Sequence, residues 1–197
     1  MKKLNLGCGQ FRKDGFVNID ISPHTRADVV HDLDQFPYPF DDETFGLIEA
    51  DHLLEHLSTP FRVMTELNRL LKPGGIIHIL VPHFSRGFTH PEHKRGFDVT
   101  FPSYFNRNFV GGYTGTHLIS RKTELHWFGQ KYLMKKLLSP WIYYSLLTIG
   151  RILDVAAKVS PLFCSRIWCF WVGGFYEIEF VFEKPQEGSS TVSSQEN

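Results

Sequence analysis

The feature that most constrains this chain is a glycine turn near its start. An apolar run, Leu4-Asn5-Leu6, leads directly into Gly7-Cys8-Gly9, and Asp20 ends the next apolar run. A Gly-x-Gly turn after a strand lets a ligand approach the backbone closely, and an acidic residue that ends the second strand can accept both hydroxyls of a ribose. The sequence therefore predicts a site for a cofactor that contains a nucleoside.

Two familiar nucleotide sites fit this turn poorly. The dinucleotide fingerprint requires a third glycine where this chain has Arg12, and Asp20 follows the turn sooner than the acidic residue of an NAD site does. A phosphate-binding P-loop requires Gly-Lys-Ser or Gly-Lys-Thr after the turn, and the sequence has neither there. NAD is therefore disfavoured, and a P-loop is excluded.

Short apolar runs that alternate with turns indicate an α/β sheet. Strands are expected over residues 3–6, 16–20, 28–31, 45–50, 76–81, 121–128 and 176–183, and the first five are expected to be parallel and buried. A helix is expected to begin after Ser58 or Thr59 and to end at residues 72–75. The residues expected on its apolar face are Phe61, Met64, Leu67 and Leu71.

The segment between the last two expected strands is too long for a hairpin loop, so a helical insertion is expected at about 130–175. One helical face of it carries Ile142, Leu146, Ile149, Leu153 and Ala157, and the opposite face carries Arg151, Asp154 and Lys158. An aromatic cluster follows at 162–172. Peripheral membrane contact through 140–175 and binding of a lipid-like acceptor fit this pattern, as do packing on the sheet and a homodimer interface.

Composition limits the classes of protein. The chain has 197 residues with 21 Lys and Arg against 21 Asp and Glu, so a nucleic-acid partner is disfavoured. Three cysteines do not make a disulfide framework, and a reducing compartment is expected. No signal peptide or membrane span is predicted, so the expected location is cytoplasmic, with peripheral membrane contact as the alternative. Residues 185–197 are predicted to be a disordered tail.

Several motifs in order resemble the class I S-adenosylmethionine-dependent methyltransferases, in particular the compact type with a methyltransferase 11 domain. LNLGCG is similar to the first motif of that family, and Asp20 to its ribose-binding acid. DLDQFPYPFDDETFGLIEADHLLEHL is similar to the third and fourth strands, and LNRLLKPGGIIHILVP to the next helix and the fifth strand. The resemblance covers residues 4–82. It implies one domain over residues 1–184, built on a doubly wound, Rossmann-like sheet of seven mostly parallel strands, with an antiparallel last strand and a helical insertion before it.

The resemblance also implies that S-adenosyl-L-methionine is the cofactor and that its contacts lie at the ends of the first four strands. The glycine turn would hold the methionine part, Asp20 the ribose, the third strand's end the adenine, and the fourth strand's end the sulfonium side. The implied cofactor residues are Asn5, Gly7, Cys8, Gly9, Asp20, Ile21, Asp32, Leu33, Asp51 and His52.

Two departures from the family pattern stand near the turn. The family usually has an acid where this chain has Asn5. The connection at residues 10–15 is about half of what a strand-helix-strand crossover needs, so the first crossover helix is expected to be short or absent. A similar short connection into Gly-aromatic-Val-Asn-apolar-Asp occurs in one predicted methyltransferase subgroup. These departures support an alternative in which the fold is a catalytically silent, cofactor-binding scaffold or partner subunit.

Transfer of a methyl group needs few dedicated catalytic residues, because the cofactor supplies the leaving group. A protonated oxygen or nitrogen acceptor still needs a base, and histidine suits that role near neutral pH. The catalytic candidates are His83, His90 and His93, which follow the fifth expected strand. Their aromatic surroundings, residues 82–113, are expected either to close over the cofactor or to form the core of a small cap.

His52, Glu55 and His56 have a spacing that can bind a divalent metal, and some metal-dependent members of the family resemble it, with His83 in the place of their further histidine. The simpler interpretation, a histidine bonded inside the fold, is favoured, so no metal is assigned. The expected function is methyl transfer to an oxygen, or second to a nitrogen, of a small or lipid-linked metabolite. A metal-dependent RNA methyltransferase is a further alternative.

Overall fold

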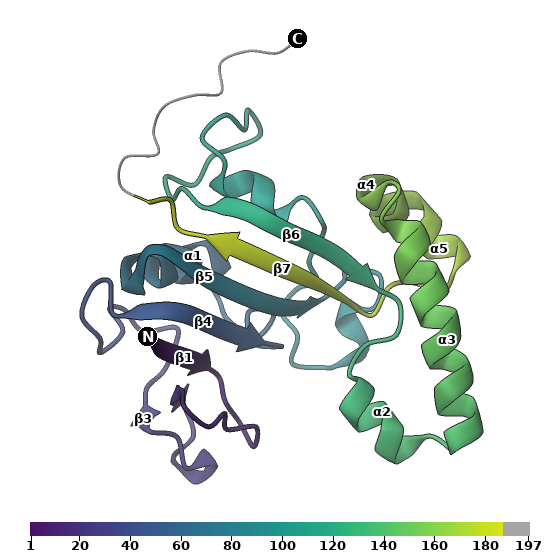
Figure 1. Cartoon of the computed structure of the whole chain (residues 1–197), viewed down its shortest axis with the longest axis horizontal. Coiled ribbons are helices and arrows are strands. Elements are labelled where there is room, and N and C mark those ends of the chain that lie inside the picture. The colour runs from purple at the N-terminus through teal and green to yellow at the C-terminus, as the bar shows by residue number, and fades with distance from the viewer. Residues whose placement is uncertain (187–197) are drawn as a thin grey trace.

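A single mixed sheet of seven strands organises the chain. In the computed structural model, which describes residues 1–186, the strand order is β3-β2-β1-β4-β5-β7-β6 (Figure 1). Strands β1 to β5 are parallel, and β7 pairs antiparallel with both β5 and β6. The strands are β1 (Lys2–Leu6), β2 (Val17–Asp20), β3 (Val29–Val30), β4 (Phe45–Asp51), β5 (Leu71–Pro82), β6 (Ile119–His126) and β7 (Glu177–Glu183). The seven predicted strands and the antiparallel last strand are confirmed. The predicted tail lies, from residue 187 on, outside the described residues.

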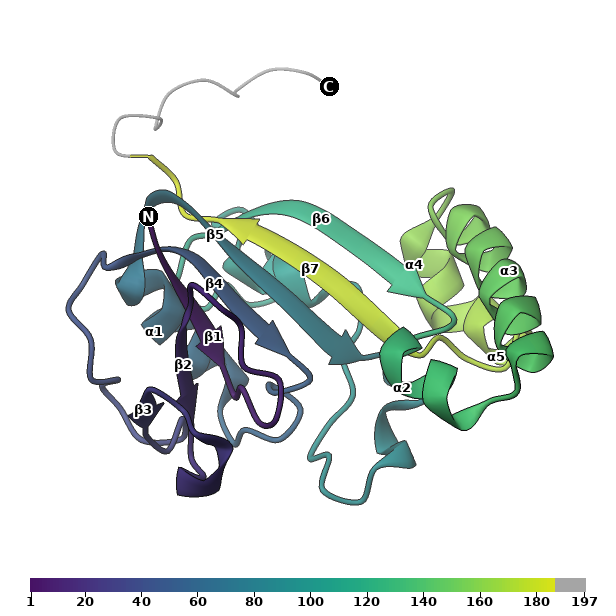
Figure 2. The same cartoon turned by 60° about the horizontal axis from the view of Figure 1, so that its bottom comes forward.

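The predicted helical insertion is also confirmed. It consists of α2 (Lys131–Leu137), α3 (Pro140–Ala157), α4 (Pro161–Phe163), a π-helical turn at Cys164–Trp168 and α5 (Cys169–Trp171). Figures 1 and 2 both show these helices grouped beyond one end of β6 and β7. The remaining long helix, α1 (Pro60–Leu70), connects β4 to β5, and single 3-10 turns lie at Pro23–Thr25, Gly87–Thr89 and Phe101–Phe105.

The expected loss of the first crossover helix is confirmed, and it leaves one face of the sheet without a crossover helix over β1 and β2. No helix lies between β1 and β2, and only a 3-10 turn lies between β2 and β3. Because β2 and β4 flank β1 on opposite sides, right-handed crossovers to them run over opposite faces of the sheet. The short connections to β2 and β3 therefore leave uncovered the face opposite α1, as Figure 1 shows.

The central strands accordingly alternate in burial, which corrects the expectation that they are buried on both faces. Ile48 and Ile77 are fully buried, whereas Glu49 and His78, which follow them in sequence, are half-buried. On the open face, His78 bonds Glu179 at 2.9 Å, and Lys122 bonds the same carboxylate at 2.9 Å. No crossover helix of the described chain packs on this part of the sheet, so its strands carry polar side chains there instead of apolar ones.

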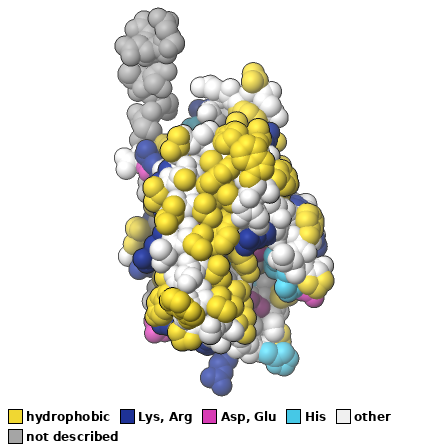
Figure 3. Space-filling view, turned by 90° about the vertical axis from the view of Figure 1, so that its right-hand side faces the viewer, with side chains coloured by type: hydrophobic (Ala, Val, Ile, Leu, Met, Phe, Trp, Pro, Cys, Tyr) yellow, Lys and Arg dark blue, Asp and Glu magenta, His cyan; other side chains and the backbone are white. Residues whose placement is uncertain are grey.

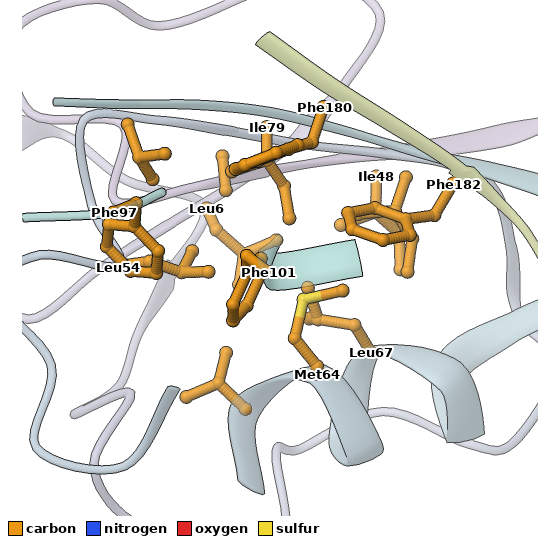
Figure 4. Packing of buried hydrophobic residues seen from close by; sticks show 14 of the residues in the cluster. Leu6, Ile48, Leu54, Met64, Leu67, Ile79, Phe97, Phe101, Phe180 and Phe182 are labelled. Atoms are coloured by element: carbon orange, nitrogen blue, oxygen red, sulfur yellow. The ribbon is translucent and has the colours of Figure 1, made fainter. Parts of the chain in front are cut away.

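The core lies between the sheet and α1. Met64 and Leu67 of α1 face the sheet, and Phe101 lies between the two layers (Figure 4). The predicted apolar face of this helix is partly wrong: Phe61 is 40% exposed, and Leu71 is the first residue of β5. Val63 and Leu70 are buried on α1 in their place. Phe61 instead packs beside the rings of the 3-10 segment, whose Phe101 and Phe105 fill the adjacent core.

Helix α3 does not pack on the sheet through the whole of its expected apolar face, which is one of the alternatives expected for this segment. Its buried residues are Tyr143, Gly150 and Ala157, whereas Ile142 and Ile149 of that apolar face are 51% and 45% exposed. Asp154, expected on the charged face, accepts the Trp127 amide at 2.7 Å. The helix lies over the polar end of edge strand β6. Asp154 and Gly150 therefore face inward, and most of the apolar residues of the helix face outward.

Candidate active site

A cavity of about 880 Å³ opens at the carboxyl ends of β1, β4 and β5, between the glycine turn and α2. This is the edge where open α/β sheets bind their ligands, and the volume is in the usual range for a cofactor or small-molecule site. The residues that line it are Asn5, Leu6, Gly7, Cys8, Gln10, Phe11, Lys13, Asp51, His52, Leu80, Gln130, Lys131, Tyr132, Leu133, Lys136 and Glu177.

The glycine turn has a backbone that only glycine accommodates easily. Gly7 has φ of +61°, and a Cβ at this position would lie 2.6 Å from Cδ1 of Leu53. Gly9 also has a positive φ, and its amide donates to Oδ2 of Asp20 at 2.8 Å. The Cys8 amide donates to the Ile19 carbonyl at 3.1 Å. The turn is therefore tied to the end of β2, and its backbone borders the cavity.

Asn5 fixes the short connection that replaces the first crossover helix. Its Nδ2 donates to Oδ1 of Asn18 at 2.9 Å and to the Phe11 carbonyl at 3.2 Å. Asn5 is 3% exposed, and it lines the cavity. A carboxylate here would have no hydrogen to donate to these two acceptors. The amide at the place of the usual acid is thus suited to this particular loop.

The predicted ribose and adenine residues lie at the ends of β2 and β3. Asp20 is 9% exposed, and its Oδ1 accepts the Ser22 amide at 2.9 Å, so each carboxylate oxygen keeps a second lone pair. Ile21 beside it is 63% exposed. Asp32 caps a turn by accepting the Asp34 amide, whereas the Leu33 side chain belongs to the core. The adenine contact of Leu33 stays a prediction.

Asp51 and His52 bring charge to the cavity from the end of β4. Nε2 of His52 lies 3.0 Å from Oε2 of Glu177, and Nδ1 lies 3.4 Å from Oε1 of Glu55. Burial lowers the pKa of His52, but the carboxylates of Glu177 and Glu55 outweigh burial and raise it to about 9. His52 also has a left-handed backbone, with φ of +52°. Such strain in a non-glycine residue is typical of functional sites.

A carboxylate oxygen without a hydrogen-bond partner in residues 1–186, Oδ1 of Asp51, shows how this cavity fits the predicted cofactor. Oδ1 of Asp51 is buried and has no hydrogen-bond partner among the described residues, while its Oδ2 accepts Nζ of Lys13 at 2.8 Å. S-Adenosylmethionine carries an ammonium and a sulfonium at its methionine end, and a free carboxylate oxygen beside the glycine turn can receive such a cation. The residues present therefore fit the cofactor.

Several lining residues come from segments that sequence reasoning did not assign to the site. Lys13 bridges Glu49 and Asp51, and the bonds to these carboxylates raise its pKa although burial opposes them. On the opposite wall, the Tyr132 ring meets Phe11 edge to face, with 6.1 Å between centroids. Glu177 is the first residue of β7, which runs antiparallel to β5 and therefore starts beside the carboxyl end of β5. This position in the expected last strand is the one sequence feature that could have predicted Glu177 at the cavity.

The three catalytic candidates do not line the cavity. His83 is fully buried, with Nδ1 bonded to Ser85 at 2.7 Å and Nε2 bonded to Ser165 at 2.8 Å. Burial lowers its pKa to about 4. His90 and His93 lie beside His56 instead. The assignment of a base among the three candidates stays a prediction. Both ring nitrogens of His83 are bonded to serines, so His83 is not free to act as the further histidine of the disfavoured metal alternative at His52, Glu55 and His56.

Comparison with known proteins agrees with this geometry. The methyltransferase domain family matches residues 4–79. A search of curated protein sequences finds no significant match. Among solved structures, an S-adenosylmethionine-dependent methyltransferase from Archaeoglobus fulgidus superposes with a TM-score of 0.55 at 16% identity, over 93% of this chain and 86% of that chain.

Two further structures show how widely this fold is used. Phosphoethanolamine N-methyltransferase 2 from Haemonchus contortus, in complex with S-adenosyl-L-methionine, has a TM-score of 0.53 at 16% identity, over 94% of this chain and 49% of that chain. The SpnF cyclase has a TM-score of 0.55 at 16% identity, over 94% of this chain and 75% of that chain. These similarities show the fold, and the family match covers the glycine turn and most of the parallel strands. This chain therefore has the fold of the class I S-adenosylmethionine-dependent methyltransferases, and its residues 4–79 match a methyltransferase domain.

Proposed function

We propose that the acceptor is an amphiphilic, lipid-linked metabolite, methylated on an oxygen or, second, on a nitrogen while the protein lies against a membrane surface. The observation that carries this proposal is an apolar surface that begins at the cavity. Tyr132 and Leu133 line the cavity and are also 63% and 43% exposed. The next exposed apolar residues along the chain are Leu137 and Trp141, at 67% and 83%.

This apolar face, as we call it, continues over α3, α4 and α5. It forms the side of the molecule that faces the viewer in Figure 3, where apolar side chains are gathered with basic ones between them. Its exposed members are Leu137, Trp141, Ile142, Tyr144, Ile149, Ile152, Val155, Val159, Leu162, Phe163, Ile167, Phe170 and Trp171. A patch with exposed tryptophans suits the boundary between headgroups and acyl chains.

Charge around the apolar face supports a membrane as its partner. Residues 129–172 contain six Lys and Arg and one acidic residue, Asp154, which faces inward to Trp127. Basic residues beside an apolar helix face favour anionic lipid surfaces. No helix in the described part of the chain is long and apolar enough to cross a membrane. The proposed contact is therefore interfacial.

In the cavity, the chain's own residues would bind, orient and deprotonate the acceptor. The cofactor supplies an activated methyl group, so alignment and exclusion of water do most of the catalytic work. Glu177, which His52 contacts at 3.0 Å, faces the cavity, and its carboxylate is suited to accept the acceptor's proton, whereas His83, His90 and His93 do not line the cavity.

The test is co-sedimentation with vesicles followed by methyl transfer. Wild-type protein is expected to sediment with vesicles of phosphatidylglycerol and phosphatidylcholine. Trp141→Ser combined with Phe170→Ser should weaken this binding by at least about tenfold, since each removes a large exposed apolar side chain. The matched control is Val110→Ser, which removes an exposed apolar side chain outside the apolar face.

Methyl transfer is then measured with a radiolabelled methyl group on the cofactor and a total lipid extract as the acceptor source. Label in the organic phase, lost with Asp51→Asn, is the expected result. Wild-type protein that stays in the supernatant contradicts the membrane contact. If the double variant instead converts a dimer to a monomer in sedimentation velocity, the apolar face is a homodimer interface.

A further inference from the structure

We propose that His56, His90 and His93, together with Glu55, form a binding site for one divalent transition-metal ion such as Zn²⁺. These residues lie outside the cavity of the candidate active site. The three histidines come from two segments, one after β4 and one after β5. The site is recognised by its metal-binding side chains and not by any role in methyl transfer. The inference therefore does not depend on the proposed acceptor.

The three imidazoles already converge. Ring centroids are 4.8 Å apart for His56 and His93, 5.0 Å for His90 and His93, and 5.6 Å for His56 and His90. One ring nitrogen from each histidine lies within 4.8 Å of the other two. Nitrogens bound tetrahedrally to zinc at about 2.1 Å stand roughly 3.4 Å apart, so small rotations of the rings suffice to close the site.

Glu55 provides an independent reason for a cation. Its side chain is fully buried, and neither carboxylate oxygen has a hydrogen-bond partner among the described residues. Oε1 lies 3.9 Å from Nε2 of His93, and its 3.4 Å contact with Nδ1 of His52 is an ion pair without hydrogen-bond geometry. The charge of His52 offsets part of the cost of burying this carboxylate, but both oxygens still lack a hydrogen bond within residues 1–186, so a second cation beside Glu55 would stabilise it further. The histidine cluster is placed where that cation would bind.

Backbone contacts hold the ligands in place. Nδ1 of His93 lies within hydrogen-bond distance of the Gly87 carbonyl, so Nδ1 carries the proton and Nε2 presents a lone pair toward Glu55. Metal-binding histidines commonly donate their other N–H to such a carbonyl. The Lys94 amide donates to the Glu55 carbonyl at 2.9 Å, which ties the two ligand segments together.

The site is open on one side. His90 is exposed, whereas His56 and His93 are half-buried, so an ion can enter from solvent and keep a water as a further ligand. A second group of ligating residues, at Glu124, His126 and Glu179, differs in this respect. Both of its carboxylates are already paired with Lys122, at 3.1 and 2.9 Å. The histidine cluster is therefore the better candidate.

The donor set selects the class of ion. Three imidazoles with a carboxylate favour Zn²⁺, Co²⁺ or Ni²⁺, whereas Mg²⁺ and Ca²⁺ prefer oxygen ligands. Glu55 also contacts His52, which lines the cavity, so the bound ion would lie directly behind the cofactor site. There it would fasten residues 87–94 to the segment after β4 and balance the charge of Glu55.

The experiment uses Co²⁺ and Zn²⁺ alone, on full-length protein stripped with a chelator. One Co²⁺ per chain should bind and give visible absorption bands of tetrahedral coordination, and Zn²⁺ should displace it. His90→Ala and His93→Ala should each weaken binding more than about 100-fold, and Glu55→Gln by about 10- to 100-fold. His24→Ala removes an exposed histidine elsewhere and should bind like the wild type.

Folding is checked by circular dichroism, and the His90 variant is the safer one because that side chain is exposed. Zn²⁺ should also raise the melting temperature of the wild type but not of His90→Ala. Wild-type protein that binds neither ion more tightly than about 100 µM overturns the inference. So does unchanged Zn²⁺ affinity in His93→Ala. Neither result bears on cofactor binding or on the acceptor, so this failure is distinct from a failure of the proposed function.

Discussion

At the scale of single residues, the predicted cofactor site depends on side chains whose hydrogen-bond partners require either a donor or an acceptor at that position. Asn5 donates to two oxygens in the connection between β1 and β2, and Asp20 accepts amides from both sides of its strand end. The glycine turn and Asp20 could be predicted from the sequence because they are local to one motif. The role of Asn5 could not, because its partners Asn18 and Phe11 become neighbours only when the loop closes.

Asn5→Asp should destabilise the protein, although the side chains have nearly the same shape. The carboxylate would face Oδ1 of Asn18 and the Phe11 carbonyl without a hydrogen to donate. The expected loss is about 1–3 kcal/mol of unfolding free energy, measured by urea unfolding at pH 7. Asn108→Asp, at an exposed position, is the control and should change stability by less than about 0.5 kcal/mol. Equal stability of both variants would contradict the role given to Asn5.

His52 should make the stability of the protein depend on pH. Its pKa is raised to about 9, against about 6.5 in the unfolded chain. The stabilising effect is therefore fully present below about pH 6.5 and is lost as the pH rises through 9. We compare the wild type with His52→Asn, because asparagine tolerates the left-handed backbone at this position.

The difference in unfolding free energy between these two proteins should be up to about 3 kcal/mol at pH 6.5 and should shrink by pH 9.5. Urea unfolding at both values measures it. The comparison cancels the contribution of His126, whose pKa is also raised. A difference that is the same at both pH values would mean that His52 is not the charged partner of Glu177.

At the scale of elements, apolar periodicity predicts a helix well but not the face through which it packs. Residues 142–157 have the period of an amphipathic helix, and α3 is there. Its contact face is decided by the two residues that follow β6: the Trp127 amide needs a partner, and Phe128 leaves room only for a glycine. Such a contact depends on an element far away in sequence. The apolar side is left exposed and is available to a membrane surface.

Gly150→Leu should loosen α3 from β6. A Cβ at this position would lie 2.8 Å from Cβ of Phe128, which cannot move without the strand end. Leucine has a higher helix propensity than glycine, which favours the variant by up to about 1 kcal/mol. The clash with Phe128 is expected to outweigh this gain, so the free energy of unfolding should fall by about 1–3 kcal/mol. Thermal unfolding measures it, with Ala156→Leu at an exposed position of the same helix as the control. A stabilised Gly150 variant would show that α3 does not pack on Phe128.

At the scale of the whole molecule, the short connections after β1 and β2 leave one face of the sheet to polar side chains. The parallel strands β1 to β5 and the glycine turn follow from motifs in the first 82 residues, so the sequence predicts them. The other side of the cavity comes from α2 and from Glu177 of β7, which meet the glycine turn only through long-range pairing with β5. No local pattern carries that information.

The measurement that tests the central claim most directly is calorimetric titration with S-adenosylmethionine and S-adenosylhomocysteine. Micromolar binding at one site per chain is expected. Asp20→Ala should weaken it by about 10- to 100-fold through loss of charged hydrogen bonds to the ribose, and Asp20→Asn, which keeps one acceptor oxygen for the turn, should weaken it less. Absence of binding by folded wild-type protein at millimolar ligand would contradict the account and favour a catalytically silent scaffold.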